Sequence, residues 1–361
     1  MSFHLHAAPF GLGPTAKALA IGVELVARGR EVTYHGHRDW YEMAVAAGLQ
    51  LPKGSLSSIG AGSTHVSFMD FSVVGGIPLQ SGSLVFFDSL LWARGSWTWR
   101  LPALDPTVAL IAQRFFDCRQ SRRMGDRPVI SVGAVLPFAA KAATPTATAP
   151  SDVVMALGGM RSPANTRQSV QSYVAWAARL LGRLDVPSQL VLPNMARGCI
   201  EKALPANVEV VPAEWRSLEH IVSPKALVLM PPGLETVLEM SALGVPFRLL
   251  PPFNGTQLAQ GRAYSRMANE SFLDLAALDR YPSLDRPKRF SEWTAIVQDT
   301  NTGLFADDVA TERMIFAAQA ALNDGAGLLR GANEWHQRVL ELGTSGVTEV
   351  ADYLTSREST S

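Results

Sequence analysis

The hydrophobic positions along the chain change their period in a regular order. Residues 2–8 form a short apolar run, residues 15–28 carry hydrophobic side chains on one helical face, and residues 31–35 return to a strand pattern. Gly29 stands where the helix should stop, as glycine commonly does after a helix. A strand, a helix and a second strand within about 35 residues predict a β-α-β unit with a parallel sheet.

The second half of the chain repeats this plan. Strands that alternate with helices are typical of a doubly wound α/β domain. The predicted strands cover residues 153–157, 189–192, 208–211, 226–230 and 246–250, and the predicted helices cover residues 165–184, 195–203 and 234–243. Two or three further helices are expected within 312–354, whereas the Gly- and Ser-rich stretch 54–81 is expected to be a long loop.

Length and composition favour a folded chain of two domains. At about 150 residues per domain, a chain of 361 residues corresponds to roughly two. A hydrophobic fraction of 47% with only 18% charged residues excludes intrinsic disorder. Residues 141–151 are a run of Ala, Thr and Pro with no apolar period, which predicts a linker between a domain at 1–140 and a domain at 152–330.

The charge balance and the cysteine content exclude several classes of protein. Thirty-two Lys and Arg residues oppose 32 Asp and Glu residues, so the electrostatic signature of a nucleic-acid-binding protein is missing. Two cysteines, Cys118 and Cys199, exclude a disulfide scaffold. No metal-ligand motif and no apolar run of membrane-spanning length occur. The N-terminus lacks the features of a secretion signal. We therefore expect a cytoplasmic protein with no metal.

Residues 226–257 are the segment that carries most of the chemical information. An apolar strand ends at Pro231, Gly233 allows a tight turn, and a helix follows with Thr236 in its first turn. Helix N-termini present free N–H groups and a partial positive charge, so they bind phosphate groups. Glu239 lies three residues after Thr236 on nearly the same helix face, where it could accept hydrogen bonds from a ribose.

This segment resembles the donor-binding signature of GT-B glycosyltransferases, particularly the UDP-glucuronosyl/macrolide transferase group. The residues that match in register are Gly233, Thr236, Glu239, Gly244, Val245, Pro246 and Gln257. Pro231, Pro232 and Thr256 replace the signature histidine, its neighbouring glycine and the aspartate of an Asp-Gln pair. The resemblance implies that the nucleotide donor is bound by Gly158, Gly159, Trp215, Pro232, Gly233, Leu234, Thr236, Glu239, Thr256 and Gln257.

The N-terminal half is also similar to that family, in its opening loop and in the segment 84–92. The resemblance places Gly11, Leu12, Gly13 and Trp92 on the acceptor side and Asp88 at the position of the catalytic aspartate. The position of the family's catalytic histidine is occupied by Leu12, which cannot accept a proton. Four alternatives are open: Asp88 acts as the base itself, another histidine (His6, His35 or His37) serves, the chemistry differs from sugar transfer to a hydroxyl, or the acceptor nucleophile needs little deprotonation.

The resemblance implies a GT-B fold, in which two Rossmann-like domains face a central cleft and the C-terminal helices in 331–361 pack back on the first domain. It further implies a metal-independent transferase that moves a sugar from a UDP- or TDP-type donor to a natural-product-like acceptor, as in antibiotic biosynthesis and other secondary metabolism. The Glu pair of the retaining members is absent, because Glu239 would need its partner at Pro231. Inversion is therefore expected.

Two other functions and the oligomeric state stay open. The departures at the donor and histidine positions are compatible with an enzyme of this fold that uses a non-standard donor or chemistry. They are equally compatible with a non-catalytic auxiliary protein. A homodimer is one option for the assembly.

Overall fold

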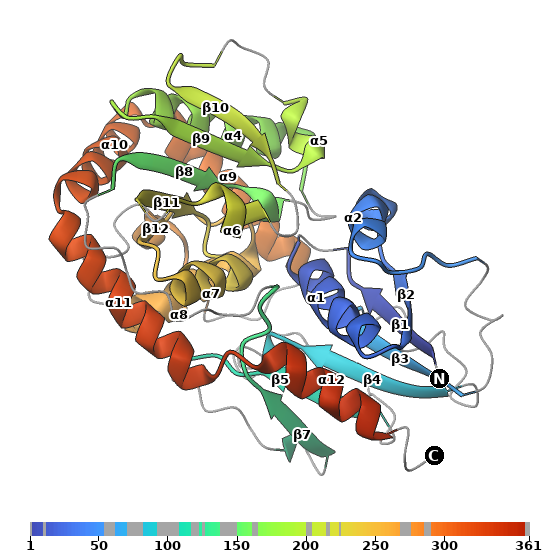
Figure 1. Cartoon of the computed structure of the whole chain (residues 1–361). Helices are drawn as coiled ribbons and strands as arrows, with labels where there is room; N and C mark the ends of the chain where they lie inside the picture. Colours follow the sequence, from blue (N-terminus) through green and yellow to red (C-terminus); the bar gives the residue numbers. More distant parts are fainter. Residues whose placement is uncertain are drawn as a thin grey trace. The chain divides into compact units, whose positions relative to one another are not determined.

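The computed structural model consists of two compact units (Figure 1). The N-terminal unit comprises Met1–Ala139 together with Val339–Ser361, and the C-terminal unit comprises Ala140–Arg338. The chain therefore leaves the N-terminal unit once and returns to it near its end. The residues that the structure describes are 2–9, 12–53, 62–70, 82–91, 108–116, 123–124, 127–137, 150–160, 165–199, 204–213, 217–223, 225–267, 276–284 and 290–357.

The described residues of the N-terminal unit form a seven-stranded sheet in the order β2-β1-β3-β4-β5-β7-β6. All neighbouring strands run parallel except β6, which is antiparallel to β7. The strands are β1 (Ser2–Ala7), β2 (Glu31–His35), β3 (Ser63–Phe68), β4 (Gly82–Asp88), β5 (Ala109–Gln113), β6 (Arg123–Met124) and β7 (Arg127–Val132). The helices are α1 (Gly13–Ala27), η1 (Arg38–Trp40), α2 (Tyr41–Ala46) and α12 (Gly346–Ser356).

The predicted β-α-β unit at the N-terminus is confirmed as β1, α1 and β2. Helix α1 packs closely on the sheet at Gly22, where an added Cβ would lie 3.1 Å from Leu5 Cδ1 and 2.6 Å from Leu49 Cδ2. Gly29 ends the helix region with a φ of +76°, a conformation that glycine adopts at little cost.

The prediction that residues 54–81 form a long loop is wrong for residues 63–68, which form the central strand β3. Thr64, Val66 and Phe68 alternate with polar residues, as expected of a strand. The polar positions Ser63 and His65 are nevertheless buried, against other polar side chains of the sheet. A buried strand with a polar face does not look like a core strand in sequence, which is why the pattern was misleading.

The C-terminal unit contains a five-stranded parallel sheet in the order β10-β9-β8-β11-β12, as far as the structure describes it. Each strand that the sequence predicts in this half is confirmed, whereas the short helix expected at 195–203 covers only Asn194–Arg197 among the described residues. The strands are β8 (Asp152–Ala156), β9 (Ser188–Leu192), β10 (Val208–Pro212), β11 (Ala226–Met230) and β12 (Phe247–Leu249). The helices are η5 (Gly158–Met160), α4 (Arg167–Gly182), α5 (Asn194–Arg197), α6 (Ser217–Ile221), α7 (Leu234–Leu243), α8 (Gly255–Met267), η7 (Leu278–Arg280), α9 (Phe290–Ala306), α10 (Asp308–Asn323) and α11 (Gly325–Leu342).

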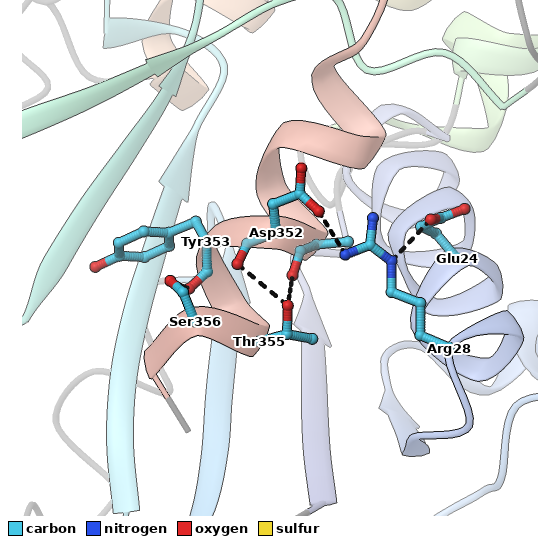
Figure 2. Close-up of polar contacts among 7 residues, drawn as sticks. Glu24, Arg28, Asp352, Tyr353, Thr355 and Ser356 are labelled. Carbon is cyan, nitrogen blue, oxygen red and sulfur yellow. Dashed lines mark hydrogen bonds and ion pairs between the residues drawn. The ribbon is translucent and has the colours of Figure 1, made fainter. Parts of the chain in front are cut away.

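Helix α12 completes the N-terminal unit by packing against α1 and β7. Two backbone hydrogen bonds fix its start: Ala134 N–H donates to Gly343 O at 2.8 Å, and Gly346 N–H donates to Ala134 O at 3.2 Å. Figure 2 shows the adjoining ion pair, in which Arg28 of α1 lies between Glu24 and Asp352. Because Asp352 is 64% exposed, its ion pair with Arg28 should contribute less than about 1 kcal/mol to the free energy of unfolding. Backbone fit and apolar burial therefore dominate the attachment of α12.

The start of α12 allows a prediction. A Cβ at residue 346 would lie 2.6 Å from Ala134 O, a backbone atom that cannot move aside. We expect Gly346→Ala to lower the free energy of unfolding by about 3 kcal/mol and to speed hydrogen exchange in 346–356. Gly303→Ala in α9 is the matched control, because nothing lies within 4 Å of its added Cβ. The free energy of unfolding of this control should rise by about 0.5–1 kcal/mol. Equal behaviour of the two variants would contradict the close fit.

Candidate functional site

The sheet order of the C-terminal unit defines a place for a ligand. Counted along the chain, its five strands have the order 3-2-1-4-5 of a dinucleotide-binding sheet. The connection from β8 leads to β9 on one side, and that from β11 leads to β12 on the other. Ligands of such sheets bind beyond the carboxyl ends of the strands, at the point where the strand order reverses. Here that point lies between the ends of β8 and β11, and we call it the switch point.

Two of the predicted donor-binding residues, Gly158 and Gly159, form the turn after β8 at the switch point. Gly159 is exposed, and a Cβ at this position would lie 3.5 Å from Gln257 Nε2. Gly158 faces the end of β10, where a Cβ added at Gly158 would lie 3.6 Å from the Cβ of Ala213. The structure therefore brings Gly159 and Gln257 together across 98 positions of sequence.

The turn after β11 supplies the second side of the switch point. Gly233 N–H donates to Pro231 O at 2.6 Å, and Val237 N–H donates to Gly233 O at 3.1 Å to begin α7. Gly233 stands at the N-cap position and has no side chain with which to cap this helix. Leu234 and both prolines are buried, and the ring of Pro232 lies against α8, where a Cβ on Gly261 would be 3.1 Å from Pro232 Cγ. The first turn of α7 is therefore reached through Gly233, which is partly exposed.

Gln257 is held by the residues that precede it in the chain. Asn254 Oδ1 accepts the Gln257 N–H at 3.0 Å, which caps the start of α8. Gln257 Oε1 accepts the Phe253 N–H at 2.6 Å. Since the side-chain oxygen is used in this way, Nε2 is the part of the amide that faces Gly159. Thr256 is only partly buried.

The remaining donor residues lie on α7 or outside the described residues. Thr236 is partly exposed, with Oγ1 3.8 Å from an added Cβ on Gly233. Glu239 lies one turn further along α7 and is 8% exposed. Gly244 ends the helix with a φ of 65°, in the left-handed region that favours glycine. Trp215 lies outside the described residues.

The predicted catalytic and acceptor-side residues belong to the N-terminal unit. Asp88 is the last residue of β4, is fully buried, and accepts the Leu90 N–H on Oδ1 at 2.9 Å. Leu12 caps α1, and Gly13 is the first residue of that helix. Gly11 and Trp92 lie outside the described residues.

Four histidines gather on one face of the N-terminal sheet, and we call them the histidine cluster: His4, His6, His35 and His65. His4 and His6 share a face because they are two residues apart on β1. The parallel pairing sets His35 of β2 level with His6, and His65 of β3 level with His4. Two imidazole–imidazole hydrogen bonds join them diagonally, His4 Nδ1 to His35 Nε2 at 2.9 Å and His6 Nε2 to His65 Nδ1 at 3.1 Å.

Burial keeps this cluster uncharged. Loss of hydration, together with a smaller effect of the nearby imidazoles, lowers the pKa of His6 to about 2. The same causes lower the pKa of His35 and of His65 to about 4, and burial lowers the pKa of His4. His6 is 1% exposed and hydrogen-bonded within the cluster. A general base needs a pKa near the working pH, so the lowered pKa of His6 and its hydrogen bond to His65 do not favour it as the base.

His6 and Asp88 are not neighbours in the sheet. Strand β3 lies between β1 and β4, which separates the two residues by two strand spacings, roughly 10 Å. The geometry therefore does not pair them as a base and its orienting acid.

No group of three or more His, Cys, Asp and Glu side chains in the described ranges is arranged to hold a metal ion. No described helix combines the length and the apolar character that crossing a bilayer requires.

Sequence reasoning missed the histidine cluster and the residues that fix Gln257. His4 and His65 are isolated in the sequence, and only the strand register places them together. The alternation of His4 and His6 was the one available signal. Contacts that Tyr173, Tyr281 and Asn301 make near Gln257 join distant segments and left no local pattern.

Comparisons with known proteins agree with this architecture. No protein-family model matches the chain, and no curated protein matches it. Among solved structures, Arabidopsis thaliana UGT89C1 complexed with quercetin has a TM-score of 0.58 at 13% identity and covers 98% of this chain and 99% of its own. The spinosyn forosaminyltransferase SpnP has a TM-score of 0.57 at 13% identity, over 99% of both chains. The spinosyn rhamnosyltransferase SpnG complexed with thymidine diphosphate has a TM-score of 0.55 at 13% identity, and the match covers 99% of this chain and 100% of its own.

These similarities extend over nearly the whole of each chain, at identities that establish the fold alone. Two mainly parallel sheets covered by helices confirm the α/β fold class that the resemblance implied. The chain therefore has the fold of the GT-B glycosyltransferases of the macrolide and plant UGT type.

Proposed function

We propose that this protein transfers a sugar from a nucleoside diphosphate donor to a small-molecule acceptor, with inversion and without a metal. The observation that carries the proposal is the approach of Gly159 and Gln257 at the switch point of the C-terminal sheet, where α7 also begins after β11. A diphosphate leaving group develops negative charge, and preorganised N–H donors stabilise such charge without a metal. The N–H groups in the first turn of α7 and the Gln257 amide are donors of this kind.

The donor and acceptor classes follow from the similar structures. UGT89C1 has also been solved with UDP and SpnG with thymidine diphosphate, so a uridine or thymidine donor is the first choice. Quercetin and the spinosyn aglycone are the acceptors named in those structures, which favours a natural-product acceptor and a place in secondary metabolism. In the N-terminal unit, Asp88 is the proposed base, with Leu12, Gly13, Gly11 and Trp92 on the acceptor side. The protein would act in the cytoplasm.

Nucleotide binding is the decisive test. Isothermal titration of the full-length protein with UDP, TDP, GDP and CDP should give micromolar binding of at least one. Binding of none would favour the auxiliary protein of the same fold. If one binds, its sugar conjugates should be incubated with phenolic and macrolide aglycones. Nucleotide binding without transfer of any sugar would favour the non-standard donor or chemistry to which Pro231, Pro232 and Leu12 point.

Glu239 provides a sharper test of the donor site. Its carboxylate lies on α7 one turn beyond the switch point, where it is expected to accept the ribose hydroxyls. Hydrogen bonds to a charged group contribute about 1.5–3 kcal/mol, so Glu239→Gln should weaken nucleoside diphosphate binding by about tenfold or more. Glu235→Gln is the matched control, with the same charge change in the first turn of the same helix. Equal affinity of the Glu239 variant and the wild type would remove Glu239 from the site.

A further inference from the structure

The connection between β12 and α8, residues 251–254, leads directly into Gln257. Pro251 and Pro252 carry no backbone N–H, so each contributes only a carbonyl to hydrogen bonding. Both residues are buried. Buried carbonyls need donors, and here the donors come from side chains of two other helices.

Tyr173 and Asn301 supply these donors. The Tyr173 hydroxyl of α4 donates to Pro251 O at 2.6 Å, and Asn301 Nδ2 of α9 donates to Pro252 O at 2.9 Å. Tyr173 is fully buried and Asn301 is 4% exposed. Two consecutive carbonyls are thus fixed from positions 78 and 49 residues away.

Tyr281 fixes the orientation of the Asn301 amide. Its hydroxyl donates to Asn301 Oδ1 at 2.5 Å, while Nδ2 faces Pro252 O, because the NH2 group is the only end of the amide that can donate to a carbonyl. Tyr281 is buried against Leu258 and Val297. Burial raises the pKa of Tyr281 and of Tyr173 well above the ordinary tyrosine range, so both hydroxyls keep their protons.

The other end of the connection reaches the switch point. The Phe253 ring packs edge-on against Tyr173, with 5.3 Å between centroids, and the Phe253 N–H holds Gln257 Oε1. A glutamine amide can present either its oxygen or its nitrogen to a ligand. Because Oε1 is held by Phe253, Nε2 is presented toward Gly159.

We propose that Asn301 and Tyr281 are positioning residues for the donor site, acting through Pro252 and Phe253 to keep the Gln257 amide turned with its N–H groups toward the switch point. The inference rests on the proposed function, because an oxygen-rich ligand such as a diphosphate or a sugar gains from N–H donors. If the connection loosened, the amide could rotate and present its oxygen, which would repel such a ligand. Neither Asn301 nor Tyr281 needs to touch the ligand in this role.

Isothermal titration of full-length variants tests the effect on binding. The probe is whichever of UDP, TDP, GDP and CDP the wild type binds best. Asn301→Ala should weaken its binding about tenfold, which corresponds to about 1.4 kcal/mol. Tyr281→Phe, which keeps the packing of the ring, should weaken it about threefold. The matched control is Thr294→Val in the same helix, since Thr294 is fully buried and its hydroxyl has no hydrogen-bond partner among the described residues. This control should bind like the wild type.

Hydrogen exchange tests the coupling without any ligand. Phe253 carries the first exchangeable amide after the two prolines, so its exchange rate, measured by NMR, reports its bond to Gln257 Oε1. This amide should exchange at least tenfold faster in Asn301→Ala and measurably faster in Tyr281→Phe, but not in Thr294→Val. Should Asn301→Ala fail to fold, Tyr281→Phe provides both readouts.

The outcomes separate this inference from the proposed function. Faster exchange together with weaker binding supports the positioning role. Faster exchange with wild-type affinity overturns it, as does unchanged exchange in both variants. If the wild type binds none of the four diphosphates, the proposed function fails and the donor role of Gln257 falls with it. The exchange measurement would then still decide whether α9 controls this connection.

Discussion

Asp88→Asn is expected to lower sugar transfer by about two to four orders of magnitude while leaving nucleoside diphosphate affinity near that of the wild type. General bases contribute about 10²–10⁴-fold to such reactions. Asparagine retains the Oδ1 atom that accepts the Leu90 N–H, so the end of β4 should keep its structure. The measurement is the initial rate of transfer to an aglycone acceptor at saturating donor, with titration of the nucleotide alongside.

His6→Gln is the companion variant for this prediction. Glutamine keeps hydrogen-bonding capacity in the histidine cluster but cannot serve as a base. If Asp88 is the base, this variant should transfer sugar at a rate close to that of the wild type. Loss of turnover in His6→Gln with full activity in Asp88→Asn would reverse the assignment. Thermal unfolding of both variants distinguishes a catalytic loss from a loss of fold.

Acidification from pH 7 to pH 5 is expected to lower the free energy of unfolding of the N-terminal unit by several kcal/mol. The folded pKa values of the buried histidines are about 4 for His35 and His65 and about 2 for His6, below the unfolded value near 6.5. Between pH 6.5 and pH 4 the unfolded chain therefore binds protons that the folded unit cannot. Each such histidine removes about 1.4 kcal/mol of stability per pH unit in this range.

Urea denaturation followed by circular dichroism at pH 7, 6 and 5 measures this effect. The full contribution of the histidine cluster is present above about pH 6.5 and decreases as the pH falls toward 4. A variant with His65→Gln should show a shallower decrease, because one proton-binding difference is removed. His220→Gln replaces an exposed histidine of the C-terminal unit and should leave the slope unchanged. A pH-independent stability of the N-terminal unit would refute the neutral state of the cluster.

The sequence predicts best those parts of the fold whose local residue pattern alone determines their place in the tertiary structure. Strands β8 and β11 are buried on both faces, so their continuous apolar runs identify them without further information. Gly244 in its left-handed conformation ends α7 at the predicted position. Strand β3 escaped because its polar face is buried against the polar faces of β1 and β2, an arrangement with no local signature.

The candidate site was predictable only as a set of residues, not as a geometry. The resemblance to a donor signature named Gly159 and Gln257, but their approach depends on the turn after β8 and the start of α8. The hydrogen bonds that orient Gln257 begin at Asn301, 44 residues further along the chain, and no pattern of hydrophobic residues records such a contact. The low pKa values of the histidine cluster likewise arise from strand register and burial, which are properties of the folded sheet alone.

The return of the chain to the N-terminal unit through α12 has a consequence for biosynthesis. The backbone of Ala134 is made early, but its partners Gly343 and Gly346 leave the ribosome only after the whole C-terminal unit. At a translation rate of about 5–20 residues per second, roughly 200 intervening residues correspond to about 10–40 s. During that interval the nascent sheet lacks its last helix, and the side of α1 that α12 later covers stays exposed.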